Sequence, residues 1–158
     1  IDVDFRNQQV HPIYEVDCQG SEPKGLAHLL RGEASMSEVV HQTFIPNLAV
    51  IPHGGRPANP TELLHSKSMN QLLDWGARKE SHIILDCPPV LPIADAAVLA
   101  SKVDGVLLVV SAGETTREAC RLAIQRIKFS GGRLLGVVMQ KAPVADSPYY
   151  YGGYRQQS

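Results

Sequence analysis

The stretch Ile83-Ile84-Leu85-Asp86-Cys87-Pro88-Pro89 decides the fold of this 158-residue chain. Its apolar run is short and continuous rather than alternating, which is typical of a parallel strand covered on both faces. The two prolines cannot donate to a strand ladder, so they end the strand directly after its acid. Two further runs of the same kind, Val106–Ser111 and Leu134–Met139, extend the prediction to a parallel sheet.

Segments with helical periodicity lie between these predicted strands. The clearest helix begins at a capping threonine, Thr115 or Thr116, runs to about Phe129 and ends at Gly131-Gly132. Strands that alternate with helices favour an α/β fold, a doubly wound and mainly parallel sheet flanked by helices. Further helical segments are expected at Asn59–Glu62, Met69–Arg78 and Ala94–Ser101, and weaker strands at Asn47–Pro52 and Ile1–Val3.

The composition is that of an ordinary globular domain. Apolar residues make up 44% and charged residues 20% of the chain, and its net charge is −1. That balance gives no electrostatic case for nucleic acid as a partner. The three cysteines form no C-x-x-C pair, so a reduced cytosolic setting is expected. Residues 4–32 are only weakly patterned.

Three aspartates are the candidate chemical groups. Asp2 and Asp4 are two residues apart on an extended segment, so they project to the same face. Asp86 ends a predicted strand, where nucleotide-hydrolysing folds hold magnesium. If the three carboxylates converge within ~4 Å, each pair repels by roughly 4 kcal/mol at an effective dielectric constant of 20. Magnesium with phosphate oxygens would neutralise such a cluster, although an arginine or a proton would also do so.

A purely structural interpretation competes at each of these positions. An aspartate after a strand is a common turn or cap residue, and this applies to Asp86. Cys87 is expected to be a small strand-end residue rather than a nucleophile. His53 and His82 are expected to be surface histidines.

Four of the five tyrosines, Tyr149, Tyr150, Tyr151 and Tyr154, lie in the last ten residues. Their neighbours are Gly, Ser, Pro and Gln, and no aliphatic residue surrounds the rings, so no hydrophobic core requires them. Such a tail suits an enzyme that modifies phenolic hydroxyls, and it is equally compatible with a merely disordered end.

Taken in order, these motifs resemble the cytoplasmic domain of bacterial tyrosine kinases, the P-loop autokinases of capsule and exopolysaccharide export. The resemblance covers nearly the whole chain. It implies a P-loop NTPase-like sheet, with residues 1–144 as a partial kinase domain and residues 145–158 as a flexible tail. The motifs that carry it are Ile1–Arg6, Gly25–Ser35, Pro46–Gly54, Pro57–Leu64, Ile83–Val90, Asp95-Ala96, Val103–Arg117, Leu135–Val138 and the tyrosine cluster.

The resemblance also implies roles and ligands, namely ATP and Mg²⁺. Asp2 would hold magnesium or take the proton of the attacking tyrosine, with Asp4 beside it. Asp86 would orient magnesium through water, and Arg6 would contact the cofactor. Gln140-Lys141 would lie near the adenine, although the family usually has Asn where Gln140 stands.

The tail and the surroundings of the protein follow from the same resemblance. Tyr149, Tyr150, Tyr151 and Tyr154 would accept phosphate, offered to a neighbouring subunit of a homo-oligomeric ring. A membrane-anchored polysaccharide co-polymerase region or activator would be the partner, at the cytoplasmic face of the bacterial plasma membrane. Four phosphates would add roughly −6 to −8 charges to the tail and are expected to drive subunits apart.

One motif of the family is absent from the sequence. Its phosphate-binding loop, G-x-x-x-x-G-K-[ST], does not occur, and no Gly-Lys dipeptide is present. We expect that loop to lie upstream of Ile1 in the complete protein and the fragment alone to be inactive. The alternatives are a deviant P-loop ATPase of the partitioning or division-site type, which would need no tyrosine tail, and a non-catalytic interaction module.

Overall fold

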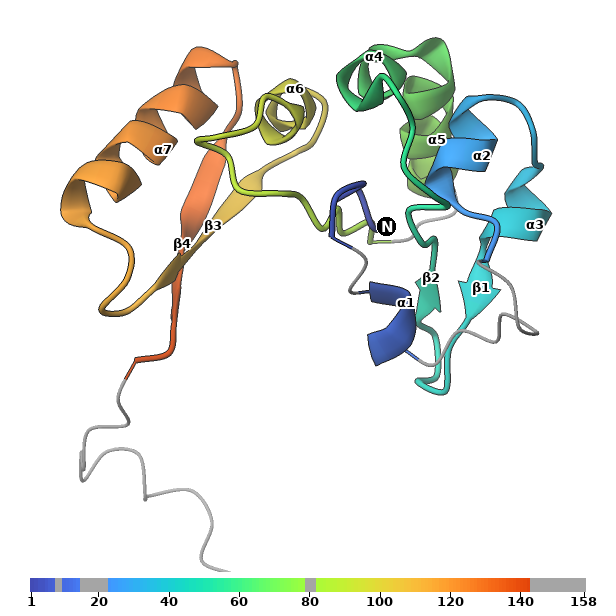
Figure 1. Ribbon diagram of the computed structural model, residues 1–158, viewed down its shortest axis with the longest axis horizontal. Coiled ribbons are helices and arrows are strands. Elements are labelled where there is room, and N and C mark those ends of the chain that lie inside the picture. Colours follow the sequence, from blue (N-terminus) through green and yellow to red (C-terminus); the bar gives the residue numbers. More distant parts are fainter. Residues whose placement is uncertain (8–9, 15–22, 79–81, 143–158) are drawn as a thin grey trace, which may run out of the picture.

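The computed structural model describes residues 1–7, 10–14, 23–78 and 82–142 as helices with two small sheets (Figure 1). This is an α/β fold, as the sequence predicts. The predicted tail lies outside the described residues. Among the residues that are described, no helix is long and apolar enough to cross a membrane. The elements are α1 (Val10–Ile13), α2 (Leu26–Leu30), α3 (Met36–Val39), β1 (His41–Gln42), β2 (Ala49–Val50), α4 (Pro60–His65), α5 (Lys67–Arg78), α6 (Asp95–Ala100), β3 (Val106–Ser111), α7 (Arg117–Phe129) and β4 (Leu134–Gln140).

β3 and β4 form a parallel pair connected by α7, which confirms two predicted strands and the predicted helix between them. The pairing runs to Ser111 opposite Gln140. The hydroxyl of Thr116 caps α7 by accepting a hydrogen bond from the backbone N of Ala119 at 3.1 Å. In Figure 1 the helix lies along one side of the strand pair.

The segment Ile1–Arg6, here termed the acidic segment, runs through the middle of the molecule. The backbone N of Asp2 donates to the carbonyl of Ile51, and the backbone N of Val3 donates to the carbonyl of Asp86, both at 2.9 Å. The acidic segment therefore lies between the chain that follows β2 and the chain that carries Asp86. Both neighbours hold its backbone in place.

Regular strands were expected at Ile1–Val3 and Ile83–Asp86, and that expectation is wrong in extent. Only one residue from each, Asp2 and Asp86, forms a parallel bridge. The ladder stops because the backbone N of Asp4 bonds to the side chain of Asp2 instead of to a neighbouring strand. The prolines after Cys87 end it on the other side.

A short antiparallel hairpin of β1 and β2 takes the place of the single strand predicted over Asn47–Pro52. Asn47 adopts a left-handed backbone with φ of 64° in the connecting turn, a conformation that asparagine tolerates better than most residues. The hydroxyl of Thr43 donates to the carbonyl of Leu48 at 2.9 Å and closes the loop. Local turn chemistry thus divides a run that hydrophobicity alone presents as continuous.

The hydrophobic core lies where the acidic segment meets α2, α4, α5 and α6. Val3 and Phe5 alternate with the acids and enter this core. The weakly patterned region 4–32 contributes more than expected, because α2 buries its apolar side chains there. The largest fully buried apolar side chains are Phe5, Leu26, Leu64, Met69, Leu72, Leu99 and Ile127.

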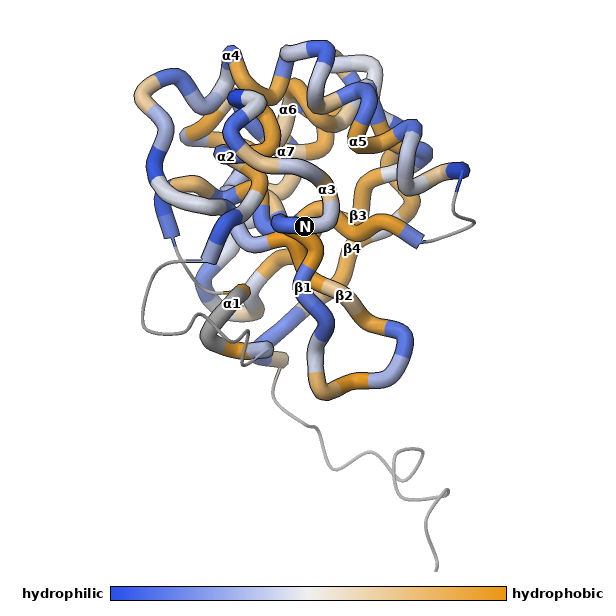
Figure 2. Tube along the Cα trace, turned by 90° about the vertical axis from the view of Figure 1, so that its right-hand side faces the viewer, coloured by the Kyte–Doolittle hydropathy of each residue, from blue (hydrophilic) through white to orange (hydrophobic). Residues whose placement is uncertain are grey.

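A second apolar region remains open to solvent. Ile84 is 78% exposed, and Leu107 and Val109 on β3 are 61% and 56% exposed. Figure 2 shows β3 and β4 as strongly hydrophobic along their length. Because such strand surfaces template pairing with other chains, this chain is expected to associate when it stands alone.

Replacing Val109 by lysine should reduce that association, because a charge on an exposed strand opposes pairing between chains. Light scattering over a concentration series measures it. The matched control is Gln125→Lys, which adds the same charge on the exposed face of α7. If the control reduces association equally, net charge rather than the β3 surface is responsible.

Candidate active site

Asp2 is completely buried, and only one of its two carboxylate oxygens accepts a hydrogen bond from the described residues. Oδ1 accepts a hydrogen bond from the backbone N of Asp4 at 3.1 Å, while Oδ2 has no hydrogen-bond partner among the described residues. The pKa of Asp2 is raised to about 6, mainly by burial and to a smaller extent by the charges of Asp86 and Asp4, while His53 and the hydrogen bond from the backbone N of Asp4 lower it. Such a carboxylate favours a proton or a cation.

The three predicted acids do not form one three-carboxylate cluster. Asp86 is the bridge partner of Asp2, but Asp4 turns back and accepts the backbone N of Arg6 at 3.0 Å. Within residues 1–7, 10–14, 23–78 and 82–142, no three His, Cys, Asp or Glu side chains could together hold a metal ion. The expected convergence is wrong because the turn after Val3 engages the carboxylate of Asp4. The pair Asp2 and Asp86 still fits magnesium, which takes one or two protein carboxylates.

His53 is buried rather than on the surface, contrary to the sequence-based expectation. Only 2% of the residue is exposed, and the backbone N of Gly55 donates to its Nδ1 at 2.8 Å. Gly54 and Gly55 both adopt positive φ, so the chain reverses here and the ring is enclosed. The double glycine after the histidine was the available sequence signal for this turn. His82 is exposed, as expected.

Cys87 is partly buried beside the acids. Burial raises the pKa of its thiol to about 12, and the negative charge of Asp86 acts in the same direction. A thiol that stays protonated is a poor nucleophile. This agrees with the prediction that Cys87 has a structural place rather than a chemical one.

The guanidinium of Arg6, which is expected to contact the cofactor, pairs with Asp95. Its Nη1 lies 2.6 Å from Oδ2 of Asp95, a fully buried carboxylate in the first turn of α6. The hydroxyl of Thr61 donates to the other oxygen of Asp95 at 2.6 Å. Sequence reasoning missed this contact because 89 residues separate its partners. The cofactor role of Arg6 remains a prediction.

Gln140 and Lys141 lie at the carboxyl end of β4, and both are exposed. The amide of Gln140 donates to the hydroxyl of Ser111 at 2.9 Å. The ammonium of Lys141 pairs with Glu114 at 2.7 Å. They therefore share one strand edge, and their role near the adenine stays a prediction. The four tail tyrosines lie outside the described residues.

Solved structures of similar fold include a tyrosine kinase domain. The kinase domain of the Escherichia coli tyrosine kinase ETK matches 92% of this chain with a TM-score of 0.78 and 33% identity, over 57% of its own length. The chimerical protein CapA2B2 matches 87% with a TM-score of 0.80 and 28% identity, over 59% of its own length. No protein-family model matches the chain.

Sequence relatives decide the family. Tyrosine-protein kinase CpsD of Streptococcus agalactiae is 34% identical over 98% of this chain and 65% of its own length. CpsD of Streptococcus pneumoniae is 32% identical over 98% of this chain and 68% of its own length. The chain belongs to the bacterial tyrosine-protein kinase family. It spans 65% of the Streptococcus agalactiae kinase and 63% of YwqD, the similar kinase of Bacillus subtilis.

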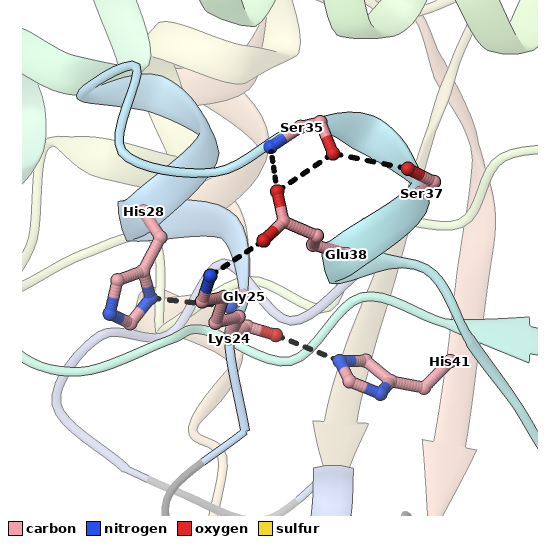
Figure 3. Close-up of polar contacts among 7 residues, drawn as sticks. All are labelled: Lys24, Gly25, His28, Ser35, Ser37, Glu38 and His41. Carbon is pink, nitrogen blue, oxygen red and sulfur yellow. Dashed lines mark hydrogen bonds and ion pairs between the residues drawn. The ribbon is translucent and has the colours of Figure 1, made fainter.

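Polar side chains within and around the family-like stretch Gly25–Ser35 form a compact cluster (Figure 3). Glu38 accepts from the ammonium of Lys24 at 2.6 Å and from the backbone N of Ser35 at 2.8 Å. His41 bonds to the carbonyl of Lys24 at 2.8 Å. Glu38 thereby connects α3 to the chain that enters α2, and these donors lower its pKa to about 2.

The chain should be more stable above pH 6 when Asp2 is replaced by Asn. The folded state raises the pKa of Asp2, so wild-type stability falls as pH rises from about 4 to about 6, by about 2 kcal/mol. The substituted amide keeps an acceptor for the backbone N of Asp4 and carries no charge. Urea unfolding at about pH 4 and about pH 8 measures the difference, and a variant that is less stable at both would contradict the expected sign.

Glu38→Gln should destabilise the chain at neutral pH and have no effect at pH about 2. The lowered pKa of Glu38 stabilises the fold above its unfolded value of 4.5, and that contribution disappears as pH falls toward 2. Salt should weaken it because the pair is exposed. Thermal unfolding between these pH values tests the window. Glu33→Gln, which breaks the similarly exposed pair with Arg31, is the control.

Proposed function

We propose that this chain is the larger part of the kinase domain of an ATP-dependent protein-tyrosine autokinase that regulates capsular or exopolysaccharide synthesis and export. The relatives, named as tyrosine-protein kinases, support the reaction class. The observation that carries the proposal is the buried, incompletely bonded carboxylate of Asp2 beside Asp86. Phosphoryl transfer depends on positioning the reacting groups and on neutralising the charge of the transferring phosphate. A fixed carboxylate that binds a cation contributes to both.

The proposed fold is a doubly wound, P-loop NTPase-like sheet. Its phosphate-binding loop is absent from this sequence, so we assign that loop to the part of the relatives' length that the chain does not span. The exposed apolar side chains of Ile84 and Leu107 support this proposal, because a further strand and helix would cover them. ATP turnover would then belong to the longer form, and this chain alone would bind ATP weakly.

Asp2 and Asp86 would hold a magnesium ion, which would supply positive charge against the phosphate oxygens of ATP. A tyrosine hydroxyl, with a pKa of about 10, keeps its proton at neutral pH, so a carboxylate must take that proton during transfer. Asp2, or Asp4 beside it, would be that base. The tyrosine oxygen bonds to the γ-phosphorus, the bond from that phosphorus to ADP breaks, and the proton passes to the carboxylate.

The tail supplies the proposed acceptors, Tyr149, Tyr150, Tyr151 and Tyr154, which a neighbouring copy would phosphorylate. Four phosphates would change a chain of net charge −1 by roughly −6 to −8, so repulsion would separate the subunits. We place this cycle at the cytoplasmic face of the plasma membrane, beside a membrane-anchored polysaccharide co-polymerase or activator. Gln140 and Lys141 would lie near the adenine.

The longest gene product that contains this sequence should form phosphotyrosine in its last ten residues when incubated with ATP and Mg²⁺. Asp2→Asn should lower the rate by at least ~100-fold, the usual contribution of a general base. Mass spectrometry measures the modified sites, and size-exclusion chromatography measures the loss of assembly that should accompany them.

Replacing all four tail tyrosines by Phe should abolish the signal and keep the subunits assembled. Tyr14→Phe is the matched control, because Tyr14 is the one tyrosine outside the tail. ATP hydrolysis with an unmodified tail would refute the kinase proposal and favour a mechanochemical ATPase.

A further inference from the structure

Asp95 joins three segments of the chain through its two carboxylate oxygens. Its side chain is fully buried in the first turn of α6. Oδ2 lies 2.6 Å from Nη1 of Arg6, and Oδ1 accepts the hydroxyl of Thr61 at 2.6 Å. The acidic segment, the start of α4 and the start of α6 therefore meet at one carboxylate.

Hydrogen bonds continue from Arg6 to the proposed active-site acids. The backbone N of Arg6 donates to Oδ1 of Asp4 at 3.0 Å, and the backbone N of Asp4 donates to Oδ1 of Asp2 at 3.1 Å. Both are turns of the kind in which an aspartate bonds to the backbone two residues on. The carbonyl of Arg6 also accepts Nη2 of Arg56 at 3.0 Å.

The two members of the ion pair differ in exposure. The side chain of Asp95 is 0% exposed, whereas that of Arg6 is 48% exposed. A buried ion pair contributes little net stability compared with apolar packing, but removing one partner leaves the other in an unfavourable state. Its stronger effect is on geometry, since a charge-assisted bond of this length restricts where the arginine can lie.

We propose that Asp95 is a positioning residue for the acidic segment. By holding Arg6, it fixes the two aspartate turns and so the directions of the Asp4 and Asp2 carboxylates. This rests on the proposed kinase function for its consequence in catalysis, but the positioning itself is a property of the fold. Asp95 touches no reacting atom in this scheme.

Hydrogen exchange tests the positioning in the 158-residue chain itself. Asp95→Asn keeps the size of the side chain and loses its charge, and it should raise exchange in a peptide covering residues 1–7 by roughly 10-fold, without a change in β4. Thr61→Val removes the other bond to the same carboxylate but leaves Arg6 paired. It should lower the melting temperature without this local effect.

Activity tests the consequence in the longest gene product that contains this chain. Asp95→Asn should lower kcat for phosphotyrosine formation by roughly 10-fold with KM for ATP within about twofold, since misplaced groups act on the chemical step. Thr61→Val and Glu118→Gln, an exposed change on α7, should leave both parameters within about twofold. Should Asp95→Asn fail to fold, Arg6→Lys takes its place in the hydrogen-exchange measurement.

The outcomes separate the two proposals. Asp95→Asn and Thr61→Val should not lower exchange protection and kcat to the same extent if Asp95 positions the acidic segment. If both variants do lower them in proportion to their loss of thermal stability, Asp95 has only a structural role and the positioning proposal is refuted. If neither the wild type nor any variant forms phosphotyrosine, the kinase proposal fails. The hydrogen-exchange result alone then decides the positioning proposal.

Discussion

The structure depends on a carboxylate that is held out of water. Asp2 cannot move toward solvent because its own backbone and that of Val3 are bonded to neighbours on opposite sides, Ile51 and Asp86. Val3 and Phe5 then enter the hydrophobic core on the other face. The burial that stabilises the fold through these apolar residues is thus coupled to an electrostatic cost at Asp2. A bound cation or a proton would relieve that cost, which connects packing directly to the proposed function.

The position of the acidic segment depends in turn on close backbone contact near α2. The backbone N of Leu26 donates to the carbonyl of Pro52 at 2.7 Å, and that of Ala27 donates to the carbonyl of His53 at 2.8 Å. A Cβ on Gly25 would lie only 2.1 Å from the Pro52 carbonyl oxygen. The Gly25-Leu26 pair is therefore a packing requirement. It holds the chain after β2 against Asp2 and encloses His53.

The elements that the sequence predicts correctly are those that are determined by signals within a few neighbouring residues. β3, α7 and β4 follow from apolar runs, a capping threonine and a glycine stop, all read within a few residues. The side-by-side placement of Asp2 and Asp86 follows from the rule that strand ends meet at one sheet edge. The hairpin, the buried His53 and the pair of Arg6 with Asp95 could not be predicted in this way. Each depends on a backbone reversal or on a partner distant in sequence. Hydrophobic periodicity predicts neither.

α6 connects the two parts of the molecule that the proposed site requires. In Figure 1 it lies between α7 and α4, and it packs against both. At its start Asp95 holds the acidic segment, and at its end Ala100 meets Gly132, where an added Cβ would lie 2.8 Å from that of Ala100. Asp2 and Asp86 belong to one part, whereas Gln140 and Lys141 belong to the strand pair on the other. Since this helix has contacts at both ends, a shift of α6 would change the distance between the acids and the β4 edge. The packing of this six-residue helix, which carries none of these groups, therefore contributes to their alignment.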